Sequence, residues 1–200
     1  MIDRLIRPVI NRPLDAGGLA LARRGVSANT VTVIGLGIGL LAAVAIALGF
    51  FVLGFVLIVV NRILDGLDGA VARASEPTDF GGYLDIVVDY VFYASIPLAF
   101  AIVNPTVNAL PAAALLGAFC LTCASFLVFA AIAAKRGIET DAHGKKSFYY
   151  STGIVEGTET IAFFLVRAAV PAWFPLLASI FAALCVLTAA QRTALAYKLF

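Results

Sequence analysis

The sequence predicts an all-α integral membrane protein with six transmembrane helices and an N-terminal amphipathic helix at the membrane interface. Hydrophobic residues make up 62% of the chain, and the mean hydropathy is +1.01. Charged residues make up only 13%, about half the share found in a soluble domain. Six apolar runs are each long enough to cross a hydrocarbon core of about 30 Å. We expect one domain over residues 1–200, with a membrane core at 30–197 and no separate soluble module.

The N-terminal segment, residues 1–24, is basic and has an amphipathic pattern. Apolar residues recur at helical spacing on one side, and arginines lie around the other. The apolar residues are Ile2, Leu5, Ile6, Val9 and Ile10, and the arginines are Arg4, Arg7 and Arg12. We expect an interfacial helix on anionic lipid that ends near Pro13. The alternative is a basic flank that only sets the topology.

Six spans follow this segment. We place them at residues 30–49, 51–72, 83–103, 110–134, 149–170 and 173–197. Three prolines, Pro105, Pro111 and Pro171, fall near the predicted turns. In the first span, Gly35 and Gly39 form a small-residue face that permits close helix approach, either within one subunit or between two.

Lysine and arginine are unevenly distributed between the ends of the spans. An even number of spans puts both termini on one side, and every Lys and Arg except Arg167 falls on or toward that side. The positive-inside rule then places the termini and the loops at 73–82 and 135–148 in the cytoplasm. We therefore expect a multi-pass protein, with a bacterial inner membrane as its natural location.

Four aspartates mark the cytoplasmic end of the second and third spans. Asp65 and Asp68 are three residues apart, and Asp85 and Asp89 are four apart, so each pair projects from one face of its helix. Carboxylates at a membrane boundary are costly unless they are paired or bind metal. Two opposed faces would offer four hard oxygen donors, which Mg²⁺ and Mn²⁺ prefer. The sequence therefore predicts a divalent metal site in a two-helix hairpin.

The order and spacing of these residues resemble the signature of the CDP-alcohol phosphotransferase family. In this chain the signature reads Asp65-x-x-Asp68-Gly69-x-x-Ala72-Arg73…Gly81-x-x-x-Asp85-x-x-x-Asp89. The segment between Arg73 and Gly81 is one residue shorter than the usual pattern, and the shortening falls in a loop. The segment at 78–81 also resembles the family, and the segment at 27–32 does so more weakly.

The resemblance implies an activity and a set of partners. Members of this family are membrane enzymes that move a phosphatidyl or other phospho-alcohol group from a CDP-linked donor, such as CDP-diacylglycerol, to the hydroxyl of a small alcohol. CMP is released, and one or two Mg²⁺ or Mn²⁺ ions are required. Family members commonly form homodimers in membrane lipid, and no nucleic acid partner is expected. The active site would face the cytoplasm.

The resemblance also assigns roles to individual residues. Asp65, Asp68 and Asp85 become metal ligands, and Asp89 becomes both a ligand and the general base. The CDP donor would be bound by Gly69, Arg73, Gly81 and Asn29. Gly69 would let the nucleotide approach the helix, Gly81 would permit a tight re-entry into the third span, and Arg73 would grip the diphosphate.

Charged residues outside the motif leave several alternatives open. Arg62 lies one turn deeper than Asp65, and we interpret it as compensation for the acidic cluster. The acceptor candidates are Lys135, Arg136, Lys145 and Glu156. The basic loop favours a phosphorylated alcohol such as glycerol 3-phosphate or an inositol phosphate. The acidic residues at the start of the fifth span favour an amino alcohol or a plain polyol.

Two other functions compete with this interpretation. A Mg²⁺-dependent membrane prenyltransferase also binds diphosphate through helical aspartates, but the spacing of Gly69, Arg73 and Gly81 fits it poorly. A cation transporter would use the acids as ligands, although such sites usually lie near the bilayer midplane in proteins with internal repeats.

Overall fold

The computed structural model describes residues 3–138, 153–155 and 157–200, with side chains from residue 13 onward. Every regular element in this part of the chain is helical. The elements are α1 (Asp3–Arg23), α2 (Ala28–Ala47), α3 (Phe51–Ala74), α4 (Asp79–Val103), α5 (Pro105–Lys135), α6 (Gly157–Ala169), the short 3₁₀ helix η2 (Pro171–Trp173) and α7 (Phe174–Leu199).

Four segments are long and apolar enough to cross a membrane: α2, α4, α5 and the combined segment Pro171–Leu199. The 24 residues of α3 are also long enough, but its second half carries the charged residues of the motif. The described part of α6 has 13 residues. The protein is therefore an all-helical, multi-pass membrane protein.

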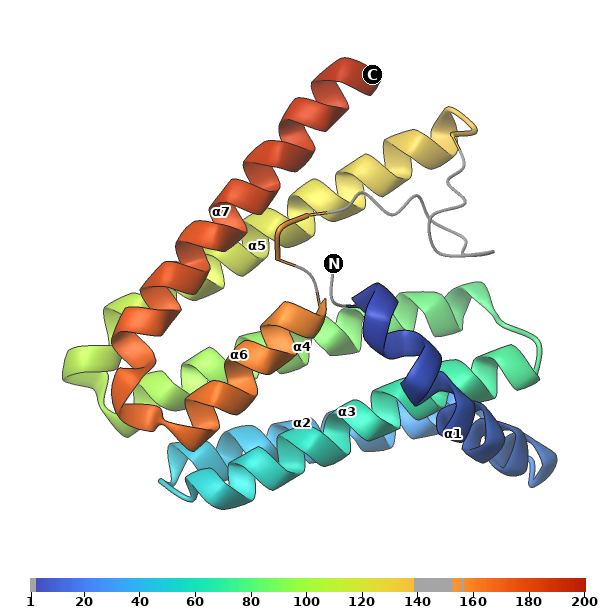
Figure 1. Ribbon diagram of the computed structural model, residues 1–200, viewed down its shortest axis with the longest axis horizontal. Helices are drawn as coiled ribbons and strands as arrows, with labels where there is room; N and C mark the ends of the chain where they lie inside the picture. The colour runs from blue at the N-terminus through green and yellow to red at the C-terminus, as the bar shows by residue number, and fades with distance from the viewer. Residues whose placement is uncertain (1–2, 139–152, 156) are drawn as a thin grey trace.

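The helices form two groups, which are joined by the packing of α4 on α5 and by side chains of α6. In the first group α2, α3 and α4 pack together, and in the second α5 packs along α7 (Figure 1). Buried phenylalanines connect the groups: the ring of Phe164 on α6 meets Phe92 of α4 and Phe119 of α5 edge-on, with centroids 5.7 and 6.3 Å apart. Edge-to-face packing of this kind is favourable for aromatic rings. It ties the site-bearing helices to the second group.

Local sequence signals explain where two of the site-bearing helices begin. The side chain of Ser27 accepts a hydrogen bond from the backbone N–H of Thr30 at 3.2 Å and caps α2. Thr78 caps α4 in the same way, accepting from the N–H of Gly81 at 3.0 Å. Gly49 makes the turn between α2 and α3 with φ of 84°, a conformation that glycine adopts without steric cost.

The first helix is longer than the sequence predicts. α1 runs through Pro13 to Arg23, so the expected end near Pro13 is wrong. A proline removes one helical hydrogen bond, but the part of α1 beyond Pro13 is held by packing against α3. A Cβ on Gly18 would lie 2.6 Å from the carbonyl carbon of Ala70, so the two backbones are in direct contact.

Other predicted boundaries also shift. α4 begins at Asp79 rather than residue 83, because Thr78 supplies the cap. α5 begins at Pro105 rather than residue 110, since proline fits the first position of a helix, and Pro111 lies inside α5 rather than in a turn. Residues 153–155 are not helical, so the helix expected to begin at 149 is seen here from Gly157.

The contact between α1 and α3 predicts an unusual response to a small substitution. Gly→Ala inside a helix normally stabilises it by about 0.5–1 kcal/mol. Gly18→Ala should instead lower the thermal unfolding temperature in detergent, because a methyl group there overlaps the α3 backbone and overpacking costs about 1–3 kcal/mol. Gly37→Ala is the matched control, since no atom lies within 4 Å of a Cβ at that position. Equal unfolding temperatures for the two variants would contradict the packing.

Candidate active site

Three of the four motif aspartates converge between α3 and α4. One carboxylate oxygen from each of Asp65, Asp85 and Asp89 lies within 4.8 Å of the other two. Asp65 comes from α3, and the other two lie one turn apart on α4. Asp85 is exposed and its two neighbours are partly buried. Three hard oxygen donors drawn from two helices form a set that suits Mg²⁺ or Mn²⁺.

The fourth aspartate faces α2. Asp68 is 6% exposed, and its Oδ2 accepts a hydrogen bond of 2.7 Å from the hydroxyl of Thr32. Asp68 is not part of the three-carboxylate group, but it lines the same small pocket as Asp65. That pocket is lined by Thr32, Gly35, Leu36, Asn61, Arg62, Asp65, Asp68 and Val88. Both aspartates of α3 therefore border one hollow beside α2.

Arg62 lies against the three converging carboxylates. Its Nη1 is 3.1 Å from Asp89 Oδ1 and 3.6 Å from Asp65 Oδ1. Its Nε donates to Asn61 Oδ1 at 2.7 Å, and its guanidinium carbon lies 4.5 Å from the centre of the Phe92 ring. These ion pairs agree with the interpretation of Arg62 as a counter-ion for the acidic cluster.

The small-residue face of α2 packs against this site within the same chain. The buried amide of Asn61 donates to the carbonyl of Gly35 at 2.8 Å. A Cβ on Gly39 would lie 2.7 Å from the ring of Phe92. Of the two alternatives left open by the sequence, packing within one subunit accounts for Gly35 and Gly39, which are both buried.

The donor-site candidates lie on the neighbouring surfaces of α3 and α4. Arg73 donates to Asp15 of α1 at 2.7 Å, and both side chains are about half exposed, at 56% and 53%. Gly69 lies one turn before Arg73, and a Cβ there would be 3.4 Å from the Arg73 Nη1. Gly69 and Arg73 therefore share one open face of α3.

Gly81 and Asn29 are also brought together. A Cβ on Gly81 would lie 3.2 Å from the side-chain oxygen of Asn29 and 3.1 Å from Thr78 Oγ1. Gly81 lies in the first turn of α4 and is not among the described glycines with positive φ. The tight re-entry expected from glycine's backbone freedom is therefore wrong: the position is restricted by space instead.

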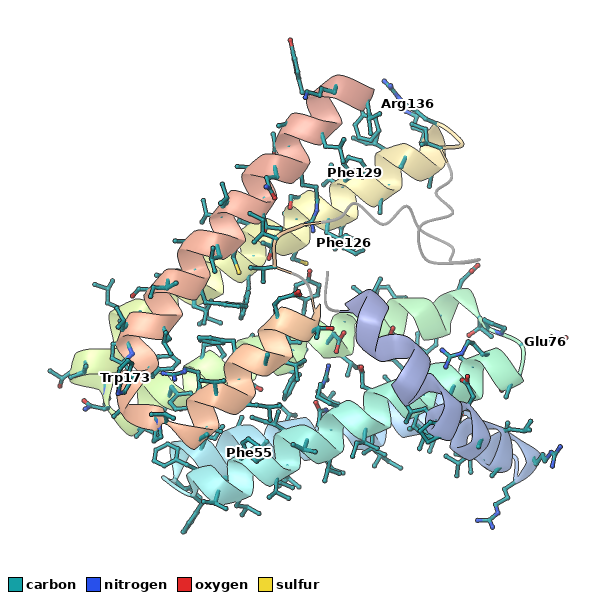
Figure 2. The ribbon with its side chains drawn as sticks, viewed as in Figure 1. Phe55, Glu76, Phe126, Phe129, Arg136 and Trp173 are labelled. Atoms are coloured by element: carbon teal, nitrogen blue, oxygen red, sulfur yellow. The ribbon has the colours of Figure 1, made fainter. Side chains whose placement is uncertain are left out.

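The two acceptor candidates that the structure describes, Lys135 and Arg136, lie at the end of α5 and not at the carboxylates. Lys135 is exposed at the end of α5. Arg136 donates to the carbonyl oxygens of Leu199 and Phe200 at 3.3 and 2.8 Å, beside the end of α7 and away from α3 (Figure 2). Lys145 and Glu156 lie outside the described residues.

Several residues that contact the motif, directly or through Arg62, were not assigned a role from the sequence. They are Asp15, Thr32, Asn61 and Tyr93. The hydroxyl of Tyr93 lies 3.4 Å from Asp89 Oδ2, at the long end of the hydrogen-bonding range. The one-turn spacing from Asp89 could have indicated Tyr93. Asp15 and Thr32 belong to distant segments, and Asn61 stands beside Arg62 without a distinctive pattern.

The comparisons with known proteins identify the family. A profile of CDP-alcohol phosphatidyltransferases matches residues 26–191. The chain belongs to this family. It is 45% identical over 192 residues to the inner membrane protein YnjF of Escherichia coli K12, covering 96% of this chain and 93% of YnjF. An archaetidylinositol phosphate synthase of Pyrococcus horikoshii is 40% identical over 98 residues, which is 48% of this chain and 52% of that one.

The fold of the family is also found among solved structures. Phosphatidylinositol phosphate synthase (PgsA1) of Mycobacterium tuberculosis with CDP-DAG bound superposes with a TM-score of 0.67 and 21% identity, covering 92% of each chain. The same enzyme in complex with manganese and citrate gives a TM-score of 0.66 and 20% identity, covering 90% of this chain and 87% of that one. At this identity the likeness establishes the fold alone.

The contact between Thr32 and Asp68 predicts an effect on metal binding. Thr32→Val removes the hydroxyl and leaves a buried carboxylate oxygen without this partner. Losing such a supporting contact typically costs about 10–100-fold in metal affinity, which Mn²⁺ titration of the purified protein would measure. Thr193→Val is the matched control. The hydroxyls of Thr32 and Thr193 each lie within hydrogen-bonding distance of a carbonyl of their own helix, at Ala28 and Ala189, but Thr193 lies on an exposed surface. Unchanged Mn²⁺ affinity in Thr32→Val would show that Asp68 needs no support from α2.

Proposed function

We propose that this protein is a divalent-metal-dependent CDP-alcohol phosphatidyltransferase that moves a phosphatidyl group from CDP-diacylglycerol to the hydroxyl of a small alcohol and releases CMP. The observation that carries the proposal is the convergence of Asp65, Asp85 and Asp89 from two helices within 4.8 Å. A relative by fold was crystallised with CDP-DAG, which supports this donor. Family membership replaces the prenyltransferase and cation-transporter hypotheses.

The carboxylates would hold Mg²⁺ or Mn²⁺. When bound, the divalent ion neutralises charge on the donor diphosphate and polarises the phosphoryl group. Asp65, Asp85 and Asp89 are the ligands that the geometry favours, and Asp68 is the candidate fourth ligand at the edge of the pocket. A fold relative in complex with manganese supports this choice of ion class.

Asp89 is the proposed general base. It would accept the proton of the acceptor hydroxyl as the new oxygen–phosphorus bond forms and the bond to CMP breaks. Arg62 donates a hydrogen bond to one oxygen of Asp89, and the Tyr93 hydroxyl lies near the other. These two contacts favour one orientation of the carboxylate. A fixed orientation matters because a base must lie within hydrogen-bonding reach of the proton that it removes.

The donor would bind along the open face of α3 and the start of α4. Arg73 presents a planar guanidinium that suits a diphosphate. Its partner Asp15 is half exposed, and exposed ion pairs contribute only about 0–1 kcal/mol, so a phosphate oxygen can replace Asp15 at little cost. Gly69 leaves the adjacent turn of α3 open, and Asn29 offers an amide beside Gly81.

The acceptor class is assigned from the relatives rather than from the described residues. Two relatives are named as synthases of archaetidylinositol phosphate and phosphatidylinositol phosphate, which puts an inositol phosphate first among acceptors. Lys135, Lys145 and Glu156 stay candidates for binding it. Arg136 is a weaker candidate, because its guanidinium already hydrogen-bonds the end of α7.

We further propose six spans, in which α3 and the segment that ends with α6 would cross the membrane beside the four apolar segments. Both termini and the active site would face the cytoplasm of a bacterial cell, which the inner-membrane relative supports. A homodimer in membrane lipid remains part of the proposal. Its interface would avoid Gly35 and Gly39, since α3 and α4 already cover them.

The proposed activity predicts a division of labour among the aspartates. Asp89→Asn should bind CDP-diacylglycerol in the presence of Mg²⁺ but release CMP about 10²–10⁴-fold more slowly, because it lacks the base. Asp68→Asn should also lose metal-dependent donor binding. The measurements are donor binding and CMP release with a panel of inositol phosphate, glycerol 3-phosphate, polyols and amino alcohols.

Asp79→Asn is the matched control for both variants, since Asp79 is an exposed aspartate in the first turn of α4. It should keep the wild-type rate. Near-normal turnover in Asp89→Asn would exclude Asp89 as the base, and CMP release that needs no divalent ion would contradict the proposed function.

The proposed topology predicts opposite accessibility at two loops. In a variant without its three native cysteines, a cysteine at Thr106 should react with a membrane-impermeant thiol reagent added to intact cells. A cysteine at Glu76 should react only after the cells are opened. Both positions are exposed (Glu76 is marked in Figure 2), so burial cannot explain a lack of labelling. The reverse pattern would invert the topology.

A further inference from the structure

Arg62 bridges carboxylates that belong to different helices. Its Nη1 lies 3.1 Å from Asp89 Oδ1 on α4 and 3.6 Å from Asp65 Oδ1 on α3. Asp65 and Asp89 also belong to the group of three whose oxygens lie within 4.8 Å of one another. A single guanidinium nitrogen therefore stands where it neutralises one carboxylate from each side of the hairpin, as a bridging cation would.

The position of this guanidinium is built by three helices. Its Nε donates to Asn61 Oδ1 at 2.7 Å, and the Asn61 amide donates in turn to the Gly35 carbonyl of α2 at 2.8 Å. The other face of the guanidinium stacks on the Phe92 ring of α4, 4.5 Å from its centre. The Arg62 side chain is only 15% exposed. Arg62 is thus a fixed part of the interior and not a surface arginine that can swing away.

A divalent ion that shares the same two oxygens would have to stand close to Nη1. Mg²⁺ binds carboxylate oxygens at about 2.0–2.1 Å, while Nη1 already contacts both at hydrogen-bonding to ion-pair distance. Two positive charges that close together in a partly buried site repel strongly. An ion bound to this cluster would therefore be held chiefly by Asp85 and by the carboxylate oxygens that Arg62 does not contact.

We propose that Arg62 takes the place of a second divalent cation, so that the carboxylate cluster binds one metal ion per chain. The proposal rests on the metal site of the proposed function and deepens it. In the metal-free protein Arg62 holds Asp65 and Asp89 together across the hairpin. In the loaded protein it supplies the fixed positive charge on one side of the cluster.

The number of bound ions tests this directly. The full-length protein in detergent is titrated with Mn²⁺ alone, without nucleotide, and bound Mn²⁺ is counted and observed by electron paramagnetic resonance. The wild type should bind one ion per chain with the spectrum of an isolated Mn²⁺. Arg62→Met keeps the length of the side chain but removes the charge. It should bind a second ion, show the spectrum of a spin-coupled pair, and bind the first about tenfold more tightly or better.

Two further variants make the result specific. Arg62→Lys restores a positive charge and should return the count to one ion with an uncoupled spectrum. Arg24→Met removes an exposed arginine at the end of α1 and should behave as the wild type. If Arg62→Met does not fold, Arg62→Gln takes its place with the same expected count and spectrum, because it also lacks the charge but keeps hydrogen-bond donors.

The outcomes separate this inference from the proposed function. A coupled pair of Mn²⁺ ions in the wild type, or a single ion of unchanged affinity in Arg62→Met, overturns the role of Arg62 and leaves the metal-dependent transferase intact. A wild type that binds no Mn²⁺ overturns the metal site, and with it both proposals.

Discussion

Carboxylates carried by two neighbouring helices repel one another unless a cation lies between them. Two like unit charges 4 Å apart repel by about 4 kcal/mol at an effective dielectric constant of about 20, and three carboxylates approach within 4.8 Å in this hairpin. The arrangement of α3 and α4 at this end of the molecule depends on compensating that repulsion. Arg62 provides part of the compensation from within the chain, and the proposed divalent ion would provide the rest.

The close packing of α1 and α2 onto α3 follows from small residues. Gly35 and Gly39 let α2 approach until its backbone accepts a hydrogen bond from Asn61, the same residue that accepts from Arg62. Gly18 lets α1 touch the α3 backbone at Ala70, within the motif itself. Helices in a membrane gain little from burying apolar surface, so close contact between backbones and buried hydrogen bonds carry more of the association. The motif is thereby held on two sides by helices outside it.

The two arginines of α3 illustrate how exposure separates two roles. Arg62 is 15% exposed and contacts residues of α3 and α4, whereas Arg73 is 56% exposed and makes one ion pair with α1. A buried and fully engaged guanidinium is expensive to move, because its partners would be left unpaired. An exposed pair exchanges partners readily. The first arrangement suits a permanent counter-ion, and the second suits a group that binds and releases a diphosphate.

The sequence alone was sufficient for the all-helical membrane class, for the approximate positions of four apolar spans, and for the family, which the profile over residues 26–191 shows. Hydropathy and the spacing of the motif are properties of short segments, and they do not depend on how the helices pack. The continuation of α1 past Pro13 was not predictable, because it depends on a contact between Gly18 and Ala70, and these residues are far apart in the chain.

Tertiary structure decided which carboxylates meet and what lies between them. Helical spacing groups Asp65 with Asp68, yet the rotation of α3 against α4 joins Asp65 to Asp85 and Asp89 and turns Asp68 toward Thr32. Tertiary packing also decides where Arg136 lies, since its place beside the end of α7 results from the packing of α5 on α7. Periodicity fixes the face of a helix on which a residue lies, but only packing fixes what that face meets.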